Sequence, residues 1–144
     1  MKNGSANNIE EAKKVLEKFL TDMNHWEVTV DQDLMDLIDN DEDTSARDKL
    51  AHDDLENIFN RFCIPGKCDR RRLLSLNTGS PATYDIERDS LEFHEQNKDS
   101  LIFLYKQDDG WDIYFTMKRY KGEWMIHKAQ YFDNEKQKLA GFIL

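Results

Sequence analysis

The segment between Asp31 and Glu56 concentrates the side chains that could bind a metal ion or a basic partner. It contains eleven carboxylates and only two basic residues, so its net charge of −9 equals the formal charge of the whole chain. The carboxylates belong to Asp31, Asp33, Asp36, Asp39, Asp41, Glu42, Asp43, Asp48, Asp53, Asp54 and Glu56. Such a concentration of charge has three explanations: a metal site, a surface for a partner, or a solvated face that favours solubility.

Calcium is the most specific chemical interpretation of this segment. Asp39, Asp41 and Asp43 match the first, third and fifth ligand positions of an EF-hand loop. The sixth position, where the loop needs glycine for its sharp turn, is Thr44, and the twelfth, where it needs a bidentate glutamate, is Leu50. A loop that lacks both residues cannot wrap the ion, so the sequence predicts no calcium site.

The two cysteines, Cys63 and Cys68, flank a Pro-Gly turn in the sequence FCIPGKC. In a reducing cytosol we expect two free thiols beside this turn, although the turn could bring them close enough for a disulfide. A structural zinc site needs four ligands, and the four histidines are scattered without partnering spacing. We therefore predict no metal site and no cofactor.

No combination of residues indicates catalysis. The chain shows no Ser, Cys or Thr nucleophile beside a histidine, no glycine-rich phosphate loop and no pair of acids on an apolar background. Several strand residues could line a pocket with Asp112 as a base, but strand aromatics usually serve packing and a lone histidine is usually exposed or hydrogen-bonded. These pocket candidates are Tyr84, Tyr105, Tyr114, His94 and His127.

Direct binding to nucleic acid or to a membrane is not expected. A chain with a pI near 4.9 repels phosphate, and the only basic cluster is Arg70, Arg71 and Arg72, which suits edge charge or pairing with the acidic helices. No apolar run approaches the roughly 20 residues of a membrane helix, and the N-terminal segment lacks the apolar stretch of a secretion signal. The sequence predicts a cytoplasmic protein.

The hydrophobic pattern indicates helices first and strands afterwards. Residues 9–26 place their apolar side chains on one stripe, which predicts an amphipathic helix capped by Asn8. Residues 34–38 and 50–62 carry two further apolar faces and predict two more helices, the second capped by Thr44 or Ser45. After the second cysteine, short segments rich in β-branched and aromatic residues predict strands. These segments are RRLLSL, ATYDIE, SLEFHE, SLIFLYK, DIYFTMKRY and EWMIHKAQYF, the last three joined into an antiparallel meander by glycine turns.

The predicted strands need a cover, because DIYFTMKRY has one fully apolar face. The N-terminal helices are the available cover, which predicts an α+β fold with helices packed on a curved antiparallel sheet. Eight residues should then be buried together: Leu16, Phe19, Leu20, Ile58, Phe59, Ile113, Phe115 and Trp124. We expect a single domain over residues 1–144, with a helical part at about 8–62, a sheet part at about 70–132 and a C-terminal tail at 133–144.

Residues 83–129 contain three features that point to a family. A Tyr-Asp pair opens TYDIERDSLEFHE before a charged break and an apolar strand, a central strand precedes the DDGW turn, and Gly122, Trp124 and Ile126 form a Gly-x-Trp-x-Ile strand. With the preceding helices, this pattern resembles the cone-shaped nuclear transport factor 2-like fold. More narrowly, it resembles the immunity proteins of that fold from bacterial polymorphic toxin systems.

The resemblance implies a protein without catalytic activity that binds and blocks a toxin. It also offers a reason for the acidic segment, since toxins that act on nucleic acid tend to have basic clefts. We therefore expect an immunity protein that neutralises a basic toxin, such as a nuclease, through the eleven carboxylates. Asp39, Asp41, Glu42 and Asp43 should be its foremost contacts, because they lie in the loop between helices.

Two alternatives remain open at the level of sequence. One is an isomerase or dehydratase with the same cone fold, and the other is a non-catalytic ligand-binding or scaffold domain. An enzyme needs a buried acid beside a polar partner inside the cone, whereas an inhibitor can fill its cone with bulky side chains. The many bulky strand residues favour a filled cone.

Overall fold

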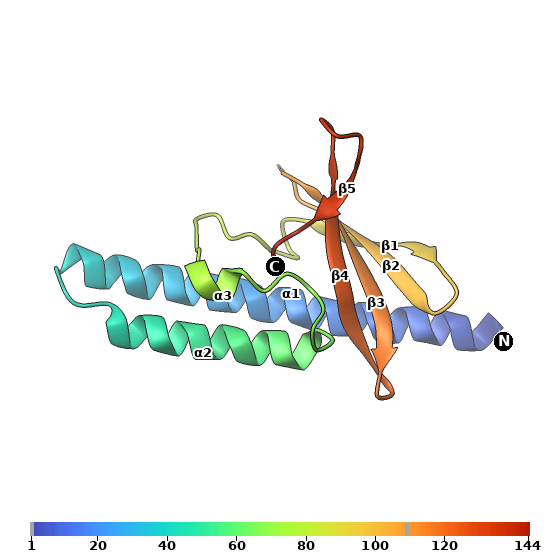
Figure 1. Cartoon of the computed structure of the whole chain (residues 1–144), viewed down its shortest axis with the longest axis horizontal. Coiled ribbons are helices and arrows are strands. Elements are labelled where there is room, and N and C mark those ends of the chain that lie inside the picture. Colours follow the sequence, from blue (N-terminus) through green and yellow to red (C-terminus); the bar gives the residue numbers. More distant parts are fainter. Residues whose placement is uncertain (1, 109) are drawn as a thin grey trace.

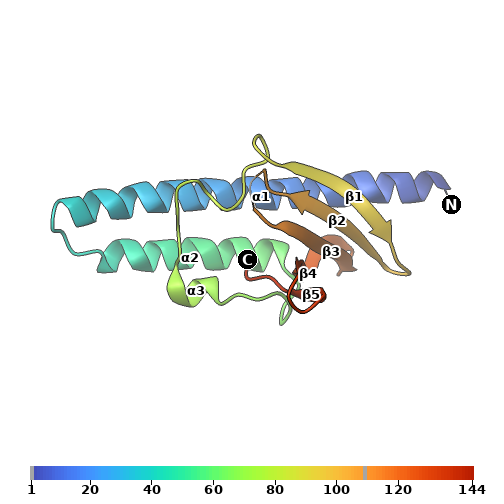
Figure 2. The ribbon, with the colours of Figure 1, turned by 90° about the horizontal axis from the view of Figure 1, so that it is seen from above.

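The computed structural model describes the backbone of residues 2–108 and 110–144, and within these ranges the side chains from Ala6 onward. The elements are α1 (Lys2–Asp39), α2 (Ser45–Phe62), α3 (Arg72–Ser75), β1 (Ser90–Gln96), β2 (Ser100–Lys106), β3 (Asp112–Tyr120), β4 (Glu123–Asp133) and β5 (Lys138–Gly141). The five strands form one antiparallel sheet in the order β1-β2-β3-β4-β5. This is the predicted α+β architecture, with the two long helices running along one side of a curved sheet (Figures 1 and 2).

The helix α1 is continuous, whereas the sequence pattern predicted two helices with a start at Asn8. That predicted cap is wrong, since the helix already runs from Lys2, and the Asn8 side chain instead accepts a hydrogen bond from Arg119 of β3 at 2.8 Å. The segment between the two predicted helices contains no glycine or proline. Glu27 and Val30 within it are buried, so packing continues through the predicted break and keeps it helical.

The core lies between the helices and the inner face of the sheet. Seven of the eight residues predicted to be buried together are buried there, and the eighth, Ile58, is half-buried against them. The rings of Phe19, Tyr84, Tyr105 and Phe115 pack with centroid distances of 5.7–6.4 Å. The interior of the cone is therefore filled with aromatic side chains.

The segment between α2 and β1 differs from the prediction. RRLLSL forms the short helix α3, and ATYDIE forms turns, so neither is a strand. A buried ion pair explains the difference: Arg72 of α3 binds Glu27 of α1 at 2.8 Å, and the Glu27 carboxylate also accepts the backbone N–H groups of Gly79 and Thr83. Backbone donors bound to a buried carboxylate cannot join a sheet.

The last residues extend the sheet. β5 pairs with β4 through residues 138–141, and the Arg72 guanidinium donates a hydrogen bond to the Leu144 carbonyl at 2.8 Å. The C-terminal segment thus packs beside α3 (Figure 1). No helix in the described part of the chain is both long and apolar enough to cross a membrane.

Candidate functional site

The acidic segment forms the far end of a helical hairpin. α1 and α2 lie side by side and extend beyond the sheet, and residues 40–44 turn between them at the end furthest from the N-terminus (Figures 1 and 2). Residues 36–43, which comprise the last turn of α1 and most of this connection, are called the hairpin end below. All of them except Leu37 are exposed.

The connection begins with a tight helix ending. The backbone N–H of Asp41 binds the carbonyl of Ile38, and the N–H of Glu42 binds the carbonyl of Leu37, which is the Schellman pattern. Asp41 occupies its left-handed position with φ of 53°, where glycine is usual. At the start of α2, Thr44 takes the predicted cap position, and its hydroxyl binds the Asp48 carboxylate at 3.0 Å rather than a backbone N–H.

The charges at the end of α1 oppose its dipole. The C-terminal end of a helix carries partial negative charge and is stabilised by basic residues, yet the last turn of α1 has none and contains Asp36 and Asp39. These two acids, together with Asp41 in a left-handed conformation, make the hairpin end less stable than it would be with basic residues in the last turn of α1 and glycine at position 41. Local rules are broken in this way mainly at functional sites.

Four of the eleven carboxylates, all outside the hairpin end, have side-chain partners, and one of these pairs joins the two helices. Asp33 binds Arg47 at 2.8 Å across the two helices, and Asp31 accepts the Thr78 hydroxyl at 2.8 Å. Asp48 accepts the Thr44 hydroxyl, and Asp53 binds Lys49 at 3.1 Å and also contacts His52. Hydrogen bonds from Lys49 and His52 lower the pKa of the Asp53 carboxyl. The only two basic residues of the segment, Arg47 and Lys49, thus both form ion pairs with acids of the same segment.

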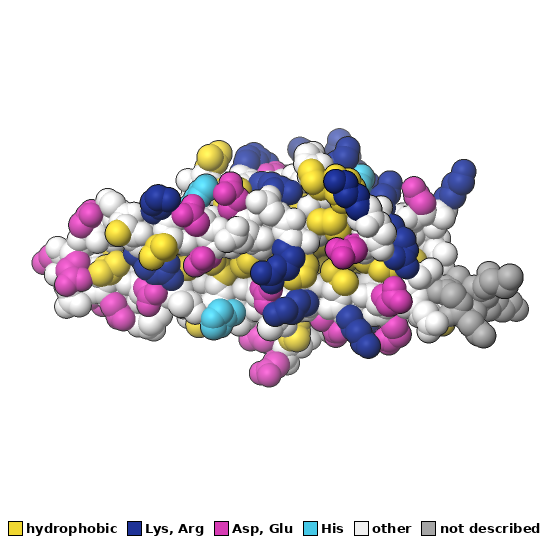
Figure 3. Space-filling view, turned by 90° about the horizontal axis from the view of Figure 1, so that it is seen from below, with side chains coloured by type: hydrophobic (Ala, Val, Ile, Leu, Met, Phe, Trp, Pro, Cys, Tyr) yellow, Lys and Arg dark blue, Asp and Glu magenta, His cyan; other side chains and the backbone are white. Residues whose placement is uncertain are grey.

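The remaining carboxylates have little or no compensation. Asp36 binds only the Gln32 amide, and Asp43 only the Ser45 hydroxyl. Five others make no side-chain hydrogen bond or ion pair within residues 6–108 and 110–144: Asp39, Asp41, Glu42, Asp54 and Glu56. In the space-filling view, acidic side chains gather toward the end of the molecule with the α1–α2 turn (Figure 3). The structure therefore brings five of the predicted contacts, those in residues 36–43, together at one end.

The other predicted contacts do not share one face. Asp33 faces α2, and Asp31 faces the loop before β1. Asp54 and Glu56 are two residues apart in α2, so they point to different sides of that helix. The acidic segment is thus a tip with carboxylates on several sides, rather than one flat patch.

A groove between α1 and α2 was missed by the sequence analysis. It has a volume of about 330 Å3, and Trp26, Val30 and Ile58 contribute its apolar lining. Asp22 and Asp54 also line it. The signal was available, because residues 22, 26 and 29 of α1 and residues 54, 58 and 61 of α2 recur at helical spacing. The predicted contacts were instead the carboxylates of residues 31–56, most of which lie outside this groove.

The pocket candidates for catalysis do not converge. Tyr84 and Tyr105 are buried in the filled cone, while His94 and Tyr114 lie on the outer face of the sheet with ring centroids 5.2 Å apart. Asp112 is exposed at the start of β3. Within the described ranges, no three His, Cys, Asp or Glu side chains are arranged to hold a metal ion.

His127 is half-buried and stands alone in β4. Burial, and then the positive charges of Lys118, Lys67 and Lys128, lower the pKa of its imidazole. A histidine among three lysines has no acid to orient it as a base, because the one carboxylate that acts on its pKa, Asp99, has the weakest effect.

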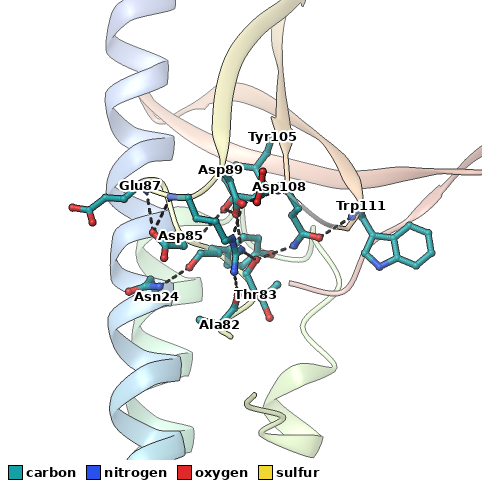
Figure 4. Close-up of polar contacts among 12 residues, drawn as sticks. Asn24, Ala82, Thr83, Asp85, Glu87, Asp89, Tyr105, Asp108 and Trp111 are labelled. Atoms are coloured by element: carbon teal, nitrogen blue, oxygen red, sulfur yellow. Dashed lines mark hydrogen bonds and ion pairs between the residues drawn. The ribbon is translucent and has the colours of Figure 1, made fainter. Parts of the chain in front are cut away.

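The Tyr-Asp motif is a structural connection (Figure 4). The Asn24 amide of α1 donates to the Tyr84 carbonyl at 2.6 Å. The Asp89 side chain is fully buried and accepts hydrogen bonds from Arg88, from the Tyr105 hydroxyl and from the backbone N–H of Asp108. Burial alone would raise the pKa of the Asp89 carboxyl, but these hydrogen bonds outweigh it and lower the pKa. An acid held ionised by three donors anchors β1 and is a poor proton acceptor.

Comparison with known proteins gives two matches. The family model described as NTF2 fold immunity protein matches residues 11–140. Immunity protein RhsIA of Dickeya dadantii (strain 3937) is 29% identical over 126 residues, which cover 86% of this chain and 89% of that protein. No solved structure matches the chain.

Proposed function

This chain belongs to the NTF2 fold immunity proteins and neutralises a toxin, and from that premise we propose that its toxin presents a basic cleft, entered by the hairpin end. The observation that carries the proposal is the set of uncompensated carboxylates at residues 36–43. Asp36 and Asp39 lie at the C-terminal end of α1, where negative charge opposes the helix dipole, so the folding of α1 gives no reason for these two. A toxin that binds nucleic acid, such as a nuclease, would have the matching positive charge.

The mechanism follows from electrostatics. The two basic residues of the segment are bound to Asp33 and Asp53, so the field of the hairpin end is not cancelled locally. Such a field attracts a positively charged cleft from a distance and raises the association rate. Once seated, carboxylates occupy the positions where phosphate groups would bind, and the substrate is excluded.

The family points to a non-catalytic role, and we propose further that the chain has no turnover of its own. The filled cone supports this, because Phe19, Tyr84 and Phe115 occupy the space where an enzyme of this fold would hold its substrate. Both cysteines are free, which supports a reducing compartment such as the cytoplasm as the place of action.

The test is the association rate with the cognate toxin domain. The hairpin-end variant carries Asp39→Asn, Asp41→Asn, Glu42→Gln and Asp43→Asn. A control variant removes the same charge from exposed acids elsewhere and carries Glu10→Gln, Glu87→Gln, Glu123→Gln and Glu135→Gln. We expect the hairpin-end variant to associate roughly 10-fold more slowly at low salt, with a smaller salt dependence, and the control to change less. Equal rates for the two variants would contradict the proposal.

A further inference from the structure

The groove between α1 and α2 lies on the surface of the hairpin and is lined by side chains of both helices. Ile58 is half-buried and gives the groove accessible apolar surface, whereas Trp26 and Val30 line it but are themselves buried; the Trp26 indole N–H donates to the Ala51 carbonyl at 2.9 Å, which fixes the ring. In the space-filling view from below, hydrophobic side chains form a broken line along the middle of this face (Figure 3). A volume of about 330 Å3 is at the lower end for ligand pockets and suits one inserted side chain.

Among the charged side chains that line the groove, both arginines have partners within the chain, and one acid, Asp54, has none among the described side chains. Arg47 binds Asp33 at 2.8 Å, and Arg61 binds Asp22 at 3.3 Å, so both arginines of the groove are paired within the chain. Asp54 lines the same groove, and its carboxylate makes no hydrogen bond or ion pair with any described side chain. It is the acid there with its acceptor oxygens available.

We propose that this groove receives one arginine side chain of the toxin, with its aliphatic part on Ile58 and its guanidinium bound to Asp54. This inference rests on the proposed function, because it assumes a basic toxin. Arginine fits better than lysine, since its planar fork binds a carboxylate with two hydrogen bonds.

The groove and the hairpin end then have different roles. Exposed carboxylates act mainly on the rate of association, whereas a side chain that loses its water in a preformed groove acts mainly on dissociation. Asp54 lies about two and a half helical turns along α2 from its first residue, so a toxin bound at the hairpin end would have to extend along the hairpin to reach it. The groove would fix the orientation of the toxin.

The first test needs no toxin. N-acetyl-arginine amide is titrated into the 15N-labelled protein, with the uncharged N-acetyl-citrulline amide as the control probe. We expect saturable shifts of the Trp26 indole and of the Thr29 and Asp54 amides with the arginine probe alone, at roughly millimolar affinity. Asp54→Asn should weaken this binding about threefold to tenfold, whereas Glu17→Gln, which removes one charge from α1 outside the groove, should leave it unchanged. Unsaturable shifts spread over the acidic segment, or equal binding to Asp54→Asn, would overturn the inference.

The second test uses the toxin and separates the two proposals. Thr29→Trp fills the groove without changing charge, and Val28→Trp places the same ring on the neighbouring exposed position outside it. We expect Thr29→Trp to speed toxin dissociation at least tenfold relative to Val28→Trp. If dissociation is the same for both while the hairpin-end variant still associates slowly, the groove inference fails and the proposed function stands. If the hairpin-end variant also associates normally, both fail.

Discussion

Asp41 occupies a position that is unfavourable for an aspartate in the fold, and we propose that it is used to contact the toxin. It holds the left-handed position of the α1 ending, with φ of 53°, where a side chain costs free energy that glycine avoids. Its carboxylate also lies beyond a helix end that repels negative charge. We expect Asp41→Gly to raise the free energy of unfolding in urea by about 0.5–1 kcal/mol, and to slow association with the toxin.

Asp41→Ala separates the two causes of this effect. It removes the charge but keeps a Cβ atom in the left-handed conformation, and alanine lacks the local hydrogen bonding through which aspartate tolerates it. The unfolding free energy of Asp41→Ala should therefore fall below that of Asp41→Gly. If Asp41→Gly were less stable than the original protein, the position would not be strained, and its aspartate would need another explanation.

Among the elements, β3 tests the filled cone most directly, because neighbouring side chains point to opposite faces of the sheet. Phe115 is fully buried against Phe19, Tyr84 and Tyr105, whereas Tyr114 is half-buried on the outer face. Phe115→Ala should lower the free energy of unfolding by about 3–5 kcal/mol in denaturant titrations. Tyr114→Ala is the matched control and should cost much less. Similar losses for both variants would show that the outer face is packed as tightly as the inner one.

The elements also show what the sequence could predict. The helical part, the meander and most of the core were predictable from the spacing of apolar residues. Phe19 is buried on the apolar stripe of a helix, and Ile113 is buried on the apolar face of a strand, as the two spacings predict. The segment after Cys68 did not follow, because its conformation depends on the Glu27–Arg72 pair, whose members lie 45 residues apart. Local propensity favoured strands there, and a long-range buried charge pair decided otherwise.

The candidate site was predictable in part for a similar reason. The charge of the hairpin end is visible in the sequence, because its five carboxylates lie within eight consecutive residues, 36–43. The groove depends on how α1 and α2 pack, which brings Trp26 beside Ala51 and Asp22 beside Arg61. Sequence analysis gave the helical faces but not their alignment, and so it found the charged end and missed the groove beside it.

At the scale of the whole molecule, charge is divided unequally between the two parts of the chain. Residues 1–60 contain sixteen acids and six bases, whereas residues 61–144 contain thirteen acids and fourteen bases. The segment with the greatest excess, residues 31–56, belongs to the hairpin of α1 and α2, which extends beyond the sheet (Figure 1). Since neighbouring carboxylates repel one another, this arrangement should destabilise the free protein and be relieved when a basic partner binds.

Salt should reveal that repulsion without any toxin. The screening length is about 30 Å at 0.01 M salt and about 10 Å at 0.1 M, so repulsion across the hairpin end weakens steeply over this range. We expect the free energy of unfolding of the original protein to rise as NaCl increases from about 0.01 to 0.3 M, whereas the hairpin-end variant should start higher and change less. Urea titrations at each salt concentration measure both, and the variant with Glu10, Glu87, Glu123 and Glu135 neutralised is the control, because those acids are dispersed over the molecule. A hairpin-end variant that is less stable than the original protein at low salt would mean that these carboxylates support the fold, and their presence would then need no partner to explain it.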